Sequence, residues 1–274
     1  MLSFKLPGAI FLSILLLLIA IPAISFNPVH TIALSQNFND SAAGPKAPLN
    51  KQAAQFVSRY LRENEECLEG VKQKSPASFE VINGVFTKYA LPLELKYLAV
   101  VESELNPKAV SRVGAVGPWQ FMPATAKVLG LKITRKYDER KNLKKSTTAA
   151  ALYLRDLYSQ YEDWLLVLAA YNCGPKHVNN AIRKSGSRNF WKLQYLLPAE
   201  SRAHVKKFIA THYYFEGSGG ITTLTRAENI QYAQELSQWV SSQAKANAAL
   251  VMLQDNSENN VTTDSLNRKV AVFK

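Results

Sequence analysis

The chain has 274 residues, of which 47% are hydrophobic, and this combination excludes a wholly disordered protein. The length suits one sizeable domain with extensions, or two small domains. A formal net charge of +12 suits an acidic partner such as nucleic acid, anionic lipid or an anionic cell-wall polymer. The basic residues are scattered and form no Arg/Lys-rich arm interleaved with aromatic residues, so the sequence argues against nucleic acid.

The first 25 residues have the pattern of an export signal. Lys5 is followed by an uncharged apolar run over residues 8–24, and Ala23 and Ser25 are small residues at the spacing that a signal peptidase needs. This run is longer than a usual signal core of about 7–15 residues and shorter than a comfortable membrane span of about 20 residues. Residues 1–25 are therefore interpreted as a signal peptide or as an uncleaved anchor that would associate with the membrane. Either interpretation predicts an exported chain that works in the periplasm or cell envelope.

Residues 26–50 are rich in Asn, Ser, Ala, Gly and Pro, which predicts a linker. From residue 51 to residue 216 the hydrophobic pattern is helical almost throughout, and no alternating strand pattern of useful length occurs. This part is predicted to be one all-α domain. The sequence GSGG at 217–220 predicts a flexible break, residues 226–253 predict an amphipathic helix, and the polar tail after them is predicted to be disordered.

Individual helices in the domain are predicted from apolar spacing and from their end signals. The stretch over 163–172 is apolar nearly all round, which indicates a helix buried inside the domain. Ser146 is predicted to cap the helix that follows it. The helices are expected over 52–71, 78–90, 91–105, 123–131, 146–161, 163–172, 176–186 and 199–217.

Only two cysteines occur, Cys67 and Cys173. Two cysteines make no disulfide framework, and sequence alone does not place them within bonding distance, so their pairing stays open. Both are interpreted as small buried hydrophobic residues. The cysteines and the four histidines show no metal-ligand spacing, and the sequence therefore predicts neither a metal site nor a cofactor.

Two carboxylates, Glu102 and Glu104, lie in the otherwise apolar stretch over 91–105. On a helix, Glu102 falls on the same arc as Leu95 and Leu98. Glu104 points roughly to the other side, which is also apolar, so periodicity separates the two acids only weakly. A carboxyl group held against hydrocarbon favours its protonated form and can act as a general acid. The alternative is a surface carboxylate paired with a basic residue, and the pattern leaves both alternatives open.

The segment SRVGAVGPWQFMP follows these acids at 111–123. Its glycines let backbone approach a ligand closely, and its aromatic and polar-tipped side chains suit sugar rings with apolar faces and hydroxyl rims. Trp119 is a candidate for stacking on a sugar, whereas Trp164 and Trp191 are assigned to core packing. The alternative is a plain turn with core aromatic residues.

Four ordered blocks resemble the lytic transglycosylases of glycoside hydrolase family 23. The block ESELNPKAVSRVGAVGPWQFMPATA resembles the family signature Glu-Ser…Asn-Pro…Ser…Gly-Ala-x-Gly-Leu-x-Gln-x-Met-Pro, and AAYNCGPKHV resembles its Ala-Tyr-Asn-x-Gly motif. The blocks YDERKNLKKSTTAAALYL and LPAESRAHV resemble those of the membrane-bound murein transglycosylase D branch. The resemblance covers residues 51–216, and it is specific because four blocks occur in order.

The resemblance implies a lysozyme-like helical catalytic domain that cleaves the β-1,4 bond between N-acetylmuramic acid and N-acetylglucosamine in peptidoglycan glycan strands. It implies that Glu102 is the catalytic residue and that Glu104 is a bystander. The positions that match the family's substrate-binding residues are Ser111, Gln120, Met122, Tyr171, Asn172 and Glu200.

The chain departs from the family pattern in the first and last blocks. Pro118 stands where Leu is usual in the first block. Ser201 and His204 stand where Thr and Tyr are usual, so the last block, which contains Glu200, matches the family pattern less fully. Asp138 and Arg140 are interpreted as a structural ion pair or helix-start contact.

The family is held to work with one carboxyl group. Glu102 would protonate the glycosidic oxygen as the bond breaks through an oxocarbenium-like state. It would then take a proton from the C6 hydroxyl, while the 2-acetamido group of the substrate stabilises the cation, giving a 1,6-anhydro ring. Two alternatives remain: a hydrolytic muramidase, in which water traps the intermediate, and an inactive cell-wall binding or scaffold protein. The oligomeric state stays open.

Overall fold

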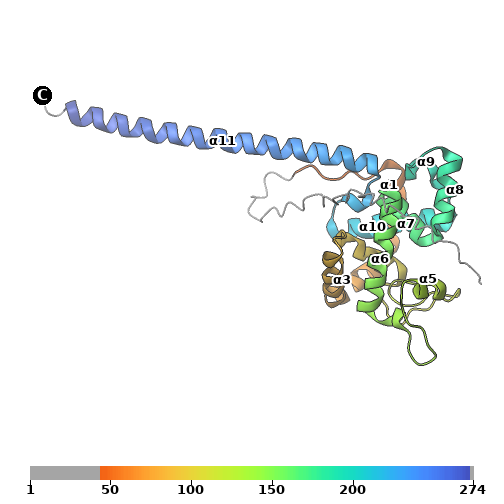
Figure 1. Ribbon diagram of the computed structural model, residues 1–274. Helices are drawn as coiled ribbons and strands as arrows, with labels where there is room; N and C mark the ends of the chain where they lie inside the picture. Colours follow the sequence, from red (N-terminus) through yellow and green to blue (C-terminus); the bar gives the residue numbers. More distant parts are fainter. Residues whose placement is uncertain (1–43, 272–274) are drawn as a thin grey trace, which may run out of the picture. The chain divides into compact units, whose positions relative to one another are not determined.

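The computed structural model describes the backbone of residues 44–271 and the side chains of residues 44–248. The predicted signal peptide or anchor at 1–25 lies outside the described residues, as does most of the predicted linker at 26–50. Within the described range the chain forms α-helices, short 3₁₀ segments and isolated bridges without a sheet, which confirms the predicted all-α class. Figure 1 shows the order of the helices along the chain.

The α-helices are α1 (Lys51–Glu63), α2 (Glu65–Lys74), α3 (Pro76–Lys88), α4 (Lys96–Ser103), α5 (Pro123–Val128), α6 (Leu143–Tyr161), α7 (Trp164–Cys173), α8 (Pro175–Ser185), α9 (Phe190–Leu193), α10 (Ala199–Glu216) and α11 (Arg226–Ala271). The 3₁₀ segments are Leu93–Leu95, Glu139–Lys141, Gln194–Leu196 and Ile221–Thr223.

Helix α7 is the centre of the core, as its apolar sequence predicts. Every residue from Trp164 to Ala170 is buried, and α6, α8 and α10 pack against it. Asp163 caps α7 by accepting hydrogen bonds from the backbone N–H groups of Leu165 at 3.0 Å and Leu166 at 3.2 Å. This cap satisfies two N–H groups that the first turn of a helix leaves without an internal partner.

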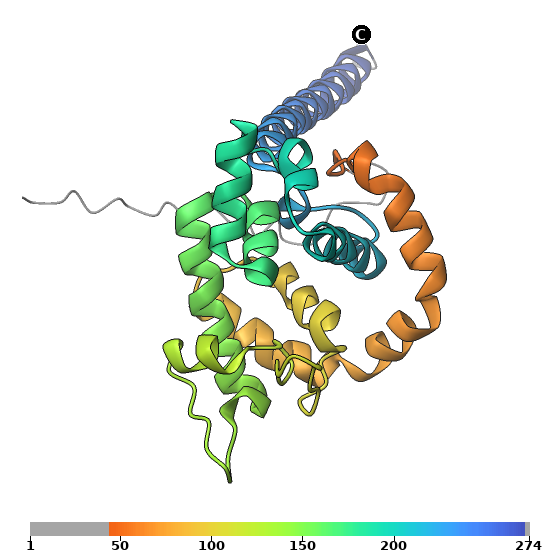
Figure 2. The ribbon, with the colours of Figure 1, turned by 90° about the vertical axis from the view of Figure 1, so that its right-hand side faces the viewer.

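Helices α4 and α10 lie side by side inside an arc formed by α1, α2 and α3 (Figure 2). The last turn of α4 carries Glu102, and α10 carries Ser201 and His204. Helix α10 also packs against α7, which carries Tyr171 and Asn172. The packing of α4, α7 and α10 therefore brings together the helices that carry the predicted site residues Glu102, Tyr171 and Asn172.

Two of the helix boundaries that differ from the sequence prediction are set by side-chain hydrogen bonds of asparagine. The helix predicted over 52–71 is interrupted at Asn64, whose side-chain amide donates to the carbonyl of Tyr60 at 2.8 Å and ends α1. Ser146 does not cap α6, because the helix begins at Leu143 with Asn142 as its cap. The side chain of Asn142 accepts from the backbone N–H of Lys145 at 2.9 Å.

Residues 217–220 are held by contacts, although the sequence predicted a flexible break there. Gly219 forms an isolated bridge with Ala47, and the backbone N–H of Gly220 donates to Oγ1 of Thr223 at 3.0 Å. Asp163 also stabilises the first turn of α11, because its carboxylate accepts a hydrogen bond from the backbone N–H of Arg226 at 2.7 Å.

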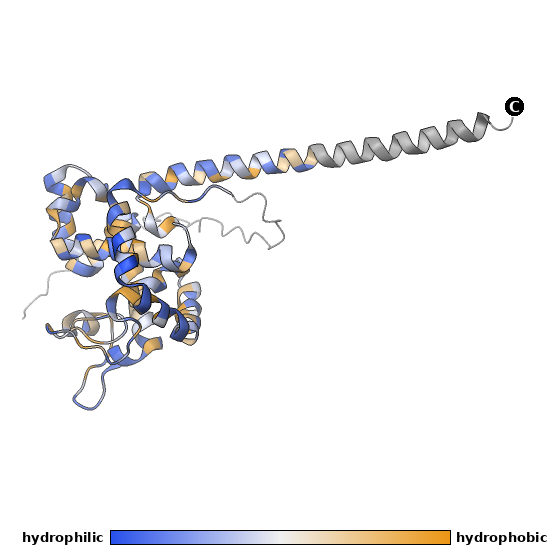
Figure 3. Cartoon of the chain, turned by 180° about the vertical axis from the view of Figure 1, so that it is seen from behind, coloured by the Kyte–Doolittle hydropathy of each residue, from blue (hydrophilic) through white to orange (hydrophobic). Residues whose placement is uncertain are grey.

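Helix α11 continues to Ala271, whereas the sequence predicted disorder after the amphipathic stretch over 226–253. Residues 226–271 contain neither glycine nor proline, so no residue among them interrupts a helix. Hydrophilic and hydrophobic residues are interspersed along the coloured part of this helix in Figure 3. Among the described residues, no helix combines the length and the hydropathy needed to cross a membrane.

The cysteines differ from the expectation that both are buried. Cys67 is exposed on α2, Cys173 is half-buried at the end of α7, and the two are not joined by a disulfide. Cys67 directly follows Glu65 and Glu66 on α2, and all three residues are exposed to solvent.

His212 makes the stability of the fold depend on pH. Its ring is buried on α10 and lies 5.8 Å from the ring of Tyr97, and burial lowers the pKa of His212 from 6.5 to about 4. The unfolded chain therefore binds more protons than the folded chain between pH 4 and 6.5, so stability falls as the pH is lowered through this window. This one group changes the free energy of unfolding by up to roughly 3 kcal/mol.

We expect the difference in unfolding free energy between the wild type and His212→Phe to grow by this amount as the pH rises from 4 to 6.5. Denaturant titrations at each pH measure it, and other titrating groups, such as Asp163, cancel in the difference. Parallel curves for the two proteins across that range would show that His212 does not carry this pH dependence.

Candidate active site

Glu102 lies in the last turn of α4, and its side chain is 14% exposed. Its Oε1 atom is 2.9 Å from Nε2 of His204 on α10. The place of Glu102 in an apolar stripe predicted apolar surroundings for its carboxyl group. The structure adds a polar contact, because a histidine ring reaches this group from the neighbouring helix. One carboxyl oxygen is held by the protein, and the group as a whole keeps contact with solvent.

Glu104 lies apart from Glu102, although the two are separated by one residue. The helix ends at Glu104, which adopts a left-handed conformation with φ of 54° and is exposed. Glu104 lines a groove bordered by α2, the start of α3 and residues 103–106. The change of backbone direction at the end of α4 thus separates two acids that periodicity alone did not distinguish.

Tyr171 links α7 to the loop after α4. Its hydroxyl donates to the carbonyl oxygen of Trp119 at 2.8 Å. Burial, and next to it the charge of Glu102, raise the pKa of Tyr171 well above its ordinary value. The phenol therefore remains a hydrogen-bond donor at neutral pH, close enough to Glu102 for its charge to act on the hydroxyl.

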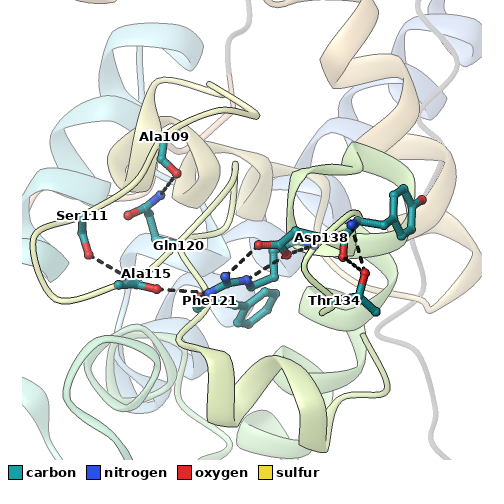
Figure 4. A network of polar contacts seen from close by, with 10 residues as sticks. Ala109, Ser111, Ala115, Gln120, Phe121, Thr134 and Asp138 are labelled. Carbon is teal, nitrogen blue, oxygen red and sulfur yellow. Dashed lines mark hydrogen bonds and ion pairs between the residues drawn. The ribbon is translucent and has the colours of Figure 1, made fainter. Parts of the chain in front are cut away.

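The loop between α4 and α5 is held from several directions. Ser103 at the end of α4 donates from Oγ to the carbonyl of Pro118 at 2.9 Å. The backbone of Ser111 pairs with that of Ala115, and Oγ of Ser111 accepts from the N–H of Ala115 at 2.9 Å. The side-chain amide of Gln120 donates to the carbonyl of Gly117 at 2.8 Å. It also makes a longer bond to the carbonyl of Ala109 at 3.4 Å, which Figure 4 shows.

Ser111 and Gln120 therefore stabilise the loop itself, a role that the family resemblance did not imply. Gln120 adopts a left-handed conformation with φ of 47°, which turns its amide back towards the loop. Met122 is 40% exposed at the end of the loop. The structure places these three residues on one segment beside the end of α4.

Arg140 fastens the loop from the other side, and sequence reasoning did not foresee this contact. Nη1 of Arg140 donates to the carbonyls of Gly114 at 3.1 Å and Phe121 at 2.9 Å. Nη2 is 2.7 Å from Oδ2 of Asp138, so the structural ion pair predicted for these two residues is present (Figure 4). The Asp138 carboxylate, whose pKa is lowered by its hydrogen bonds to Arg140, holds the guanidinium group in place.

Trp119 does not stack on a sugar, contrary to one possibility that its sequence position raised. The side chain is fully buried, and its Nε1–H donates to Oγ1 of Thr147 on α6 at 3.0 Å. The ring also packs against that of Phe86 on α3, with the ring centroids 5.7 Å apart. Trp164 and Trp191 are buried in the core, as predicted.

Asn172 and Glu200 occupy different surroundings. Oδ1 of Asn172 accepts from Oγ of Ser201 at 2.6 Å, which joins α7 to α10 beside His204. Glu200 is exposed in the first turn of α10, where a carboxylate is favoured by the helix dipole. Within the described part of the chain, Glu200 makes neither a hydrogen bond nor an ion pair, and the structure does not bring it into contact with Glu102.

His204 is the residue of this site that sequence reasoning missed. The only signal was that a histidine stands where the resembling family has tyrosine. The pattern gave no indication that its ring would reach the carboxyl group of Glu102, because α4 and α10 are about a hundred residues apart in the chain.

The described fold and site define a helical domain that presents one partly buried glutamate beside a tightly held loop. Comparisons with known proteins agree with this description. Residues 82–194 match the family model described as the transglycosylase SLT domain. This part of the chain is similar to a transglycosylase SLT domain, and it contains Glu102, Tyr171 and Asn172. The match ends before α10, so His204 lies beyond it.

The chain is homologous to membrane-bound lytic murein transglycosylase D of Escherichia coli (strain K12), with 38% identity over 168 residues. The aligned region covers 60% of this chain and 36% of that protein, so the chain spans about a third of the relative's length. A protein of Enterobacteria phage PRD1 named transglycosylase is 36% identical over 102 residues, which cover 37% of this chain and 36% of that protein. The crystal structure of the 70-kDa soluble lytic transglycosylase of Escherichia coli has a TM-score of 0.45 and 26% identity, covering 65% of this chain and 32% of that one.

Proposed function

We propose that this protein is a peptidoglycan lytic transglycosylase that cleaves the β-1,4 bond between N-acetylmuramic acid and N-acetylglucosamine. The observation that carries the proposal is Glu102, a solvent-accessible acid at the end of α4, within the segment that is similar to a transglycosylase SLT domain. Glycan strands of peptidoglycan are the proposed substrate.

Glu102 acts first as an acid and then as a base. It donates a proton to the glycosidic oxygen while the bond breaks through an oxocarbenium-like state. The resulting carboxylate takes the proton of the C6 hydroxyl, whose oxygen closes a 1,6-anhydro ring on the muramic acid. A single glutamate suffices because no separate water has to be activated.

The residues around Glu102 position the substrate. Tyr171 holds the backbone of Trp119 and thereby the loop that carries Ser111, Gln120 and Met122. Among these, the exposed side chain of Met122 is available to a sugar. The side chains of Ser111 and Gln120 can bind a sugar only through the polar atoms that are not already bonded within the loop. Asn172 completes this side of the proposed site, and Glu200 is a more distant candidate for contact with the glycan.

A hydrolytic muramidase is the alternative within the same chemistry, since one acid also protonates the leaving oxygen when water traps the intermediate. Digestion of purified sacculi by the wild-type chain, followed by mass spectrometry, separates the candidates. Muropeptides with anhydro ends are expected, reducing ends would support the muramidase, and an absence of soluble muropeptides would favour an inactive binding or scaffold protein.

We further propose that the protein works in the cell envelope, because peptidoglycan lies outside the cytoplasm. The export pattern of residues 1–25 supports this location. Whether that segment is removed or retained as a membrane anchor follows from the N-terminal sequence of the protein isolated from cells.

A further inference from the structure

The contact between His204 and Glu102 has an asymmetry that bears on proton transfer. Nε2 of His204 is 2.9 Å from Oε1 of Glu102, and the histidine side chain is 8% exposed. The other ring nitrogen, Nδ1, is fully buried and has no hydrogen-bond partner among the described residues. On the carboxyl group, Oε2 has no partner in that part of the chain either, yet it is not among the fully buried oxygens.

The buried Nδ1 atom determines where the histidine carries its hydrogen. An imidazolium would place a charged N–H donor at Nδ1 without a partner, and the Nδ1–H tautomer would place a neutral donor there. Buried N–H groups without a partner are rarer in proteins than under-satisfied acceptors. The neutral ring with its hydrogen on Nε2 avoids both situations, and this Nε2–H points at Oε1 of Glu102.

The structure assigns to His204 the role of a positioning residue for Glu102, an inference that rests on the proposed function. Neutral His204 donates from Nε2 to Oε1 both when Glu102 is protonated and when it is ionised. Oε1 is therefore always an acceptor, and Oε2, the oxygen open to solvent, alone carries the proton that is transferred.

The bonds and protons balance in this arrangement. The proton leaves Oε2 for the glycosidic oxygen, which keeps the electron pair of the broken C1–O bond. The C6 oxygen then forms the new bond to C1, and its proton returns to Oε2. His204 keeps its hydrogen throughout and touches neither the reacting carbon nor the leaving oxygen.

Tyr171 is the titratable side chain whose pKa responds to the charge of Glu102, and burial keeps it protonated and neutral. Burial also raises the pKa of Tyr60 on α1 and of Cys173 on α7, two helices that pack against α10, so these groups stay neutral as well. On α10 itself, Arg202 is bonded to the carbonyl of Leu197 at 3.0 Å, and burial lowers the pKa of Lys206.

Two variants separate the hydrogen bond from the packing of the ring. His204→Phe keeps a ring but removes the donor, and His204→Gln restores an N–H donor at a similar distance from the backbone. We expect His204→Phe to lower kcat about 10–100-fold, as for the loss of a hydrogen bond to a charged group. KM should stay within about threefold, and His204→Gln should keep kcat within about threefold of the wild type.

The pH profile provides a readout that packing alone would not move. The ionised form of Glu102 loses a hydrogen bond in His204→Phe, so the alkaline limb of kcat/KM should move to higher pH, and in His204→Gln it should not. A fully active His204→Phe would overturn the inference. So would equal losses in both variants with an unchanged alkaline limb.

NMR of the full-length chain labelled with ¹⁵N-histidine tests the tautomer without an activity assay, with His204→Gln used to assign the signal. At pH 7 we expect hydrogen on Nε2 and none on Nδ1 of His204, and a shift of this Nε2–H signal in Glu102→Gln. An Nδ1–H tautomer or an imidazolium would overturn the inference. Because this result does not depend on cleavage, it is distinguishable from a failure of the proposed function, which would appear as a wild-type chain without action on sacculi.

Discussion

Replacing Glu102 with glutamine is expected to lower the rate of peptidoglycan cleavage on the order of 10³-fold, the usual contribution of a general acid. Glutamine keeps the shape of the side chain, and its amide oxygen can still accept from Nε2 of His204. The loss therefore reflects the missing proton and not a disturbed fold. Release of soluble muropeptides from purified sacculi measures the rate, and thermal unfolding checks that the variant is folded.

Glu104→Gln is the matched control, since it makes the same chemical change two residues away. Glu104 faces the groove beside α2, outside the proposed site, so this variant should cleave at close to the wild-type rate. A folded but inactive Glu104→Gln, together with an active Glu102→Gln, would mean that the other acid of the pair performs the chemistry.

Gly117→Ala is expected to cause the largest loss of stability. Gly117 adopts a φ of 85°, and a Cβ atom added to it would lie 2.0 Å from the carbonyl oxygen of Arg140. The added Cβ atom is attached directly to the backbone of Gly117, and the atom that it meets is a backbone oxygen. No flexible side chain can therefore move aside to relieve the clash. We expect the free energy of unfolding to fall by about 3–5 kcal/mol, at the upper end for single substitutions. The displaced loop should also lower cleavage.

Gly114→Ala is the matched control, because it tests the cost of the left-handed backbone conformation without the steric clash expected in Gly117→Ala. Gly114 has a similar φ of 91°, but a Cβ atom there would meet no atom within 4 Å. Only the left-handed conformation then costs stability, by about 1–2 kcal/mol. Denaturant unfolding of both variants measures the difference, and equal losses for the two would contradict the close approach of Gly117 to Arg140.

The helical fold was largely predictable because its signals are local. Apolar spacing located the helices of the domain except the short α9, the glycine and proline at 174–175 marked the end of α7, and Gly186 ends α8 as predicted, in a left-handed conformation. The errors also have local causes. Asn64 and Asn142 form side-chain bonds that set helix ends, and apolar periodicity does not register such bonds.

The site was less predictable, because it depends on contacts between distant segments. The resemblance singled out Glu102, Tyr171 and Asn172 by position, and their roles remain predictions. No pattern indicated that Arg140 would bond to two carbonyls of the loop or that Trp119 would turn into the core. These contacts join the loop after α4 to α6 and to the 3₁₀ segment Glu139–Lys141, which are distant from it in the sequence.

His204 illustrates the same limit. In the sequence it was only a departure from the tyrosine of the resembling family, in the block that contains Glu200. In the folded chain it is the residue that bonds to Glu102. The sequence shows that one hydrogen-bond donor replaces another at position 204. It does not show which residue the new donor contacts.

Digestion of sacculi in water enriched in ¹⁸O tests most directly whether Glu102 closes an anhydro ring within the substrate. If it does, the new muramic acid ends are one water molecule lighter than reducing ends and contain no solvent oxygen. Muramic acid ends that carry ¹⁸O would contradict this chemistry, because the label would show that water attacked C1.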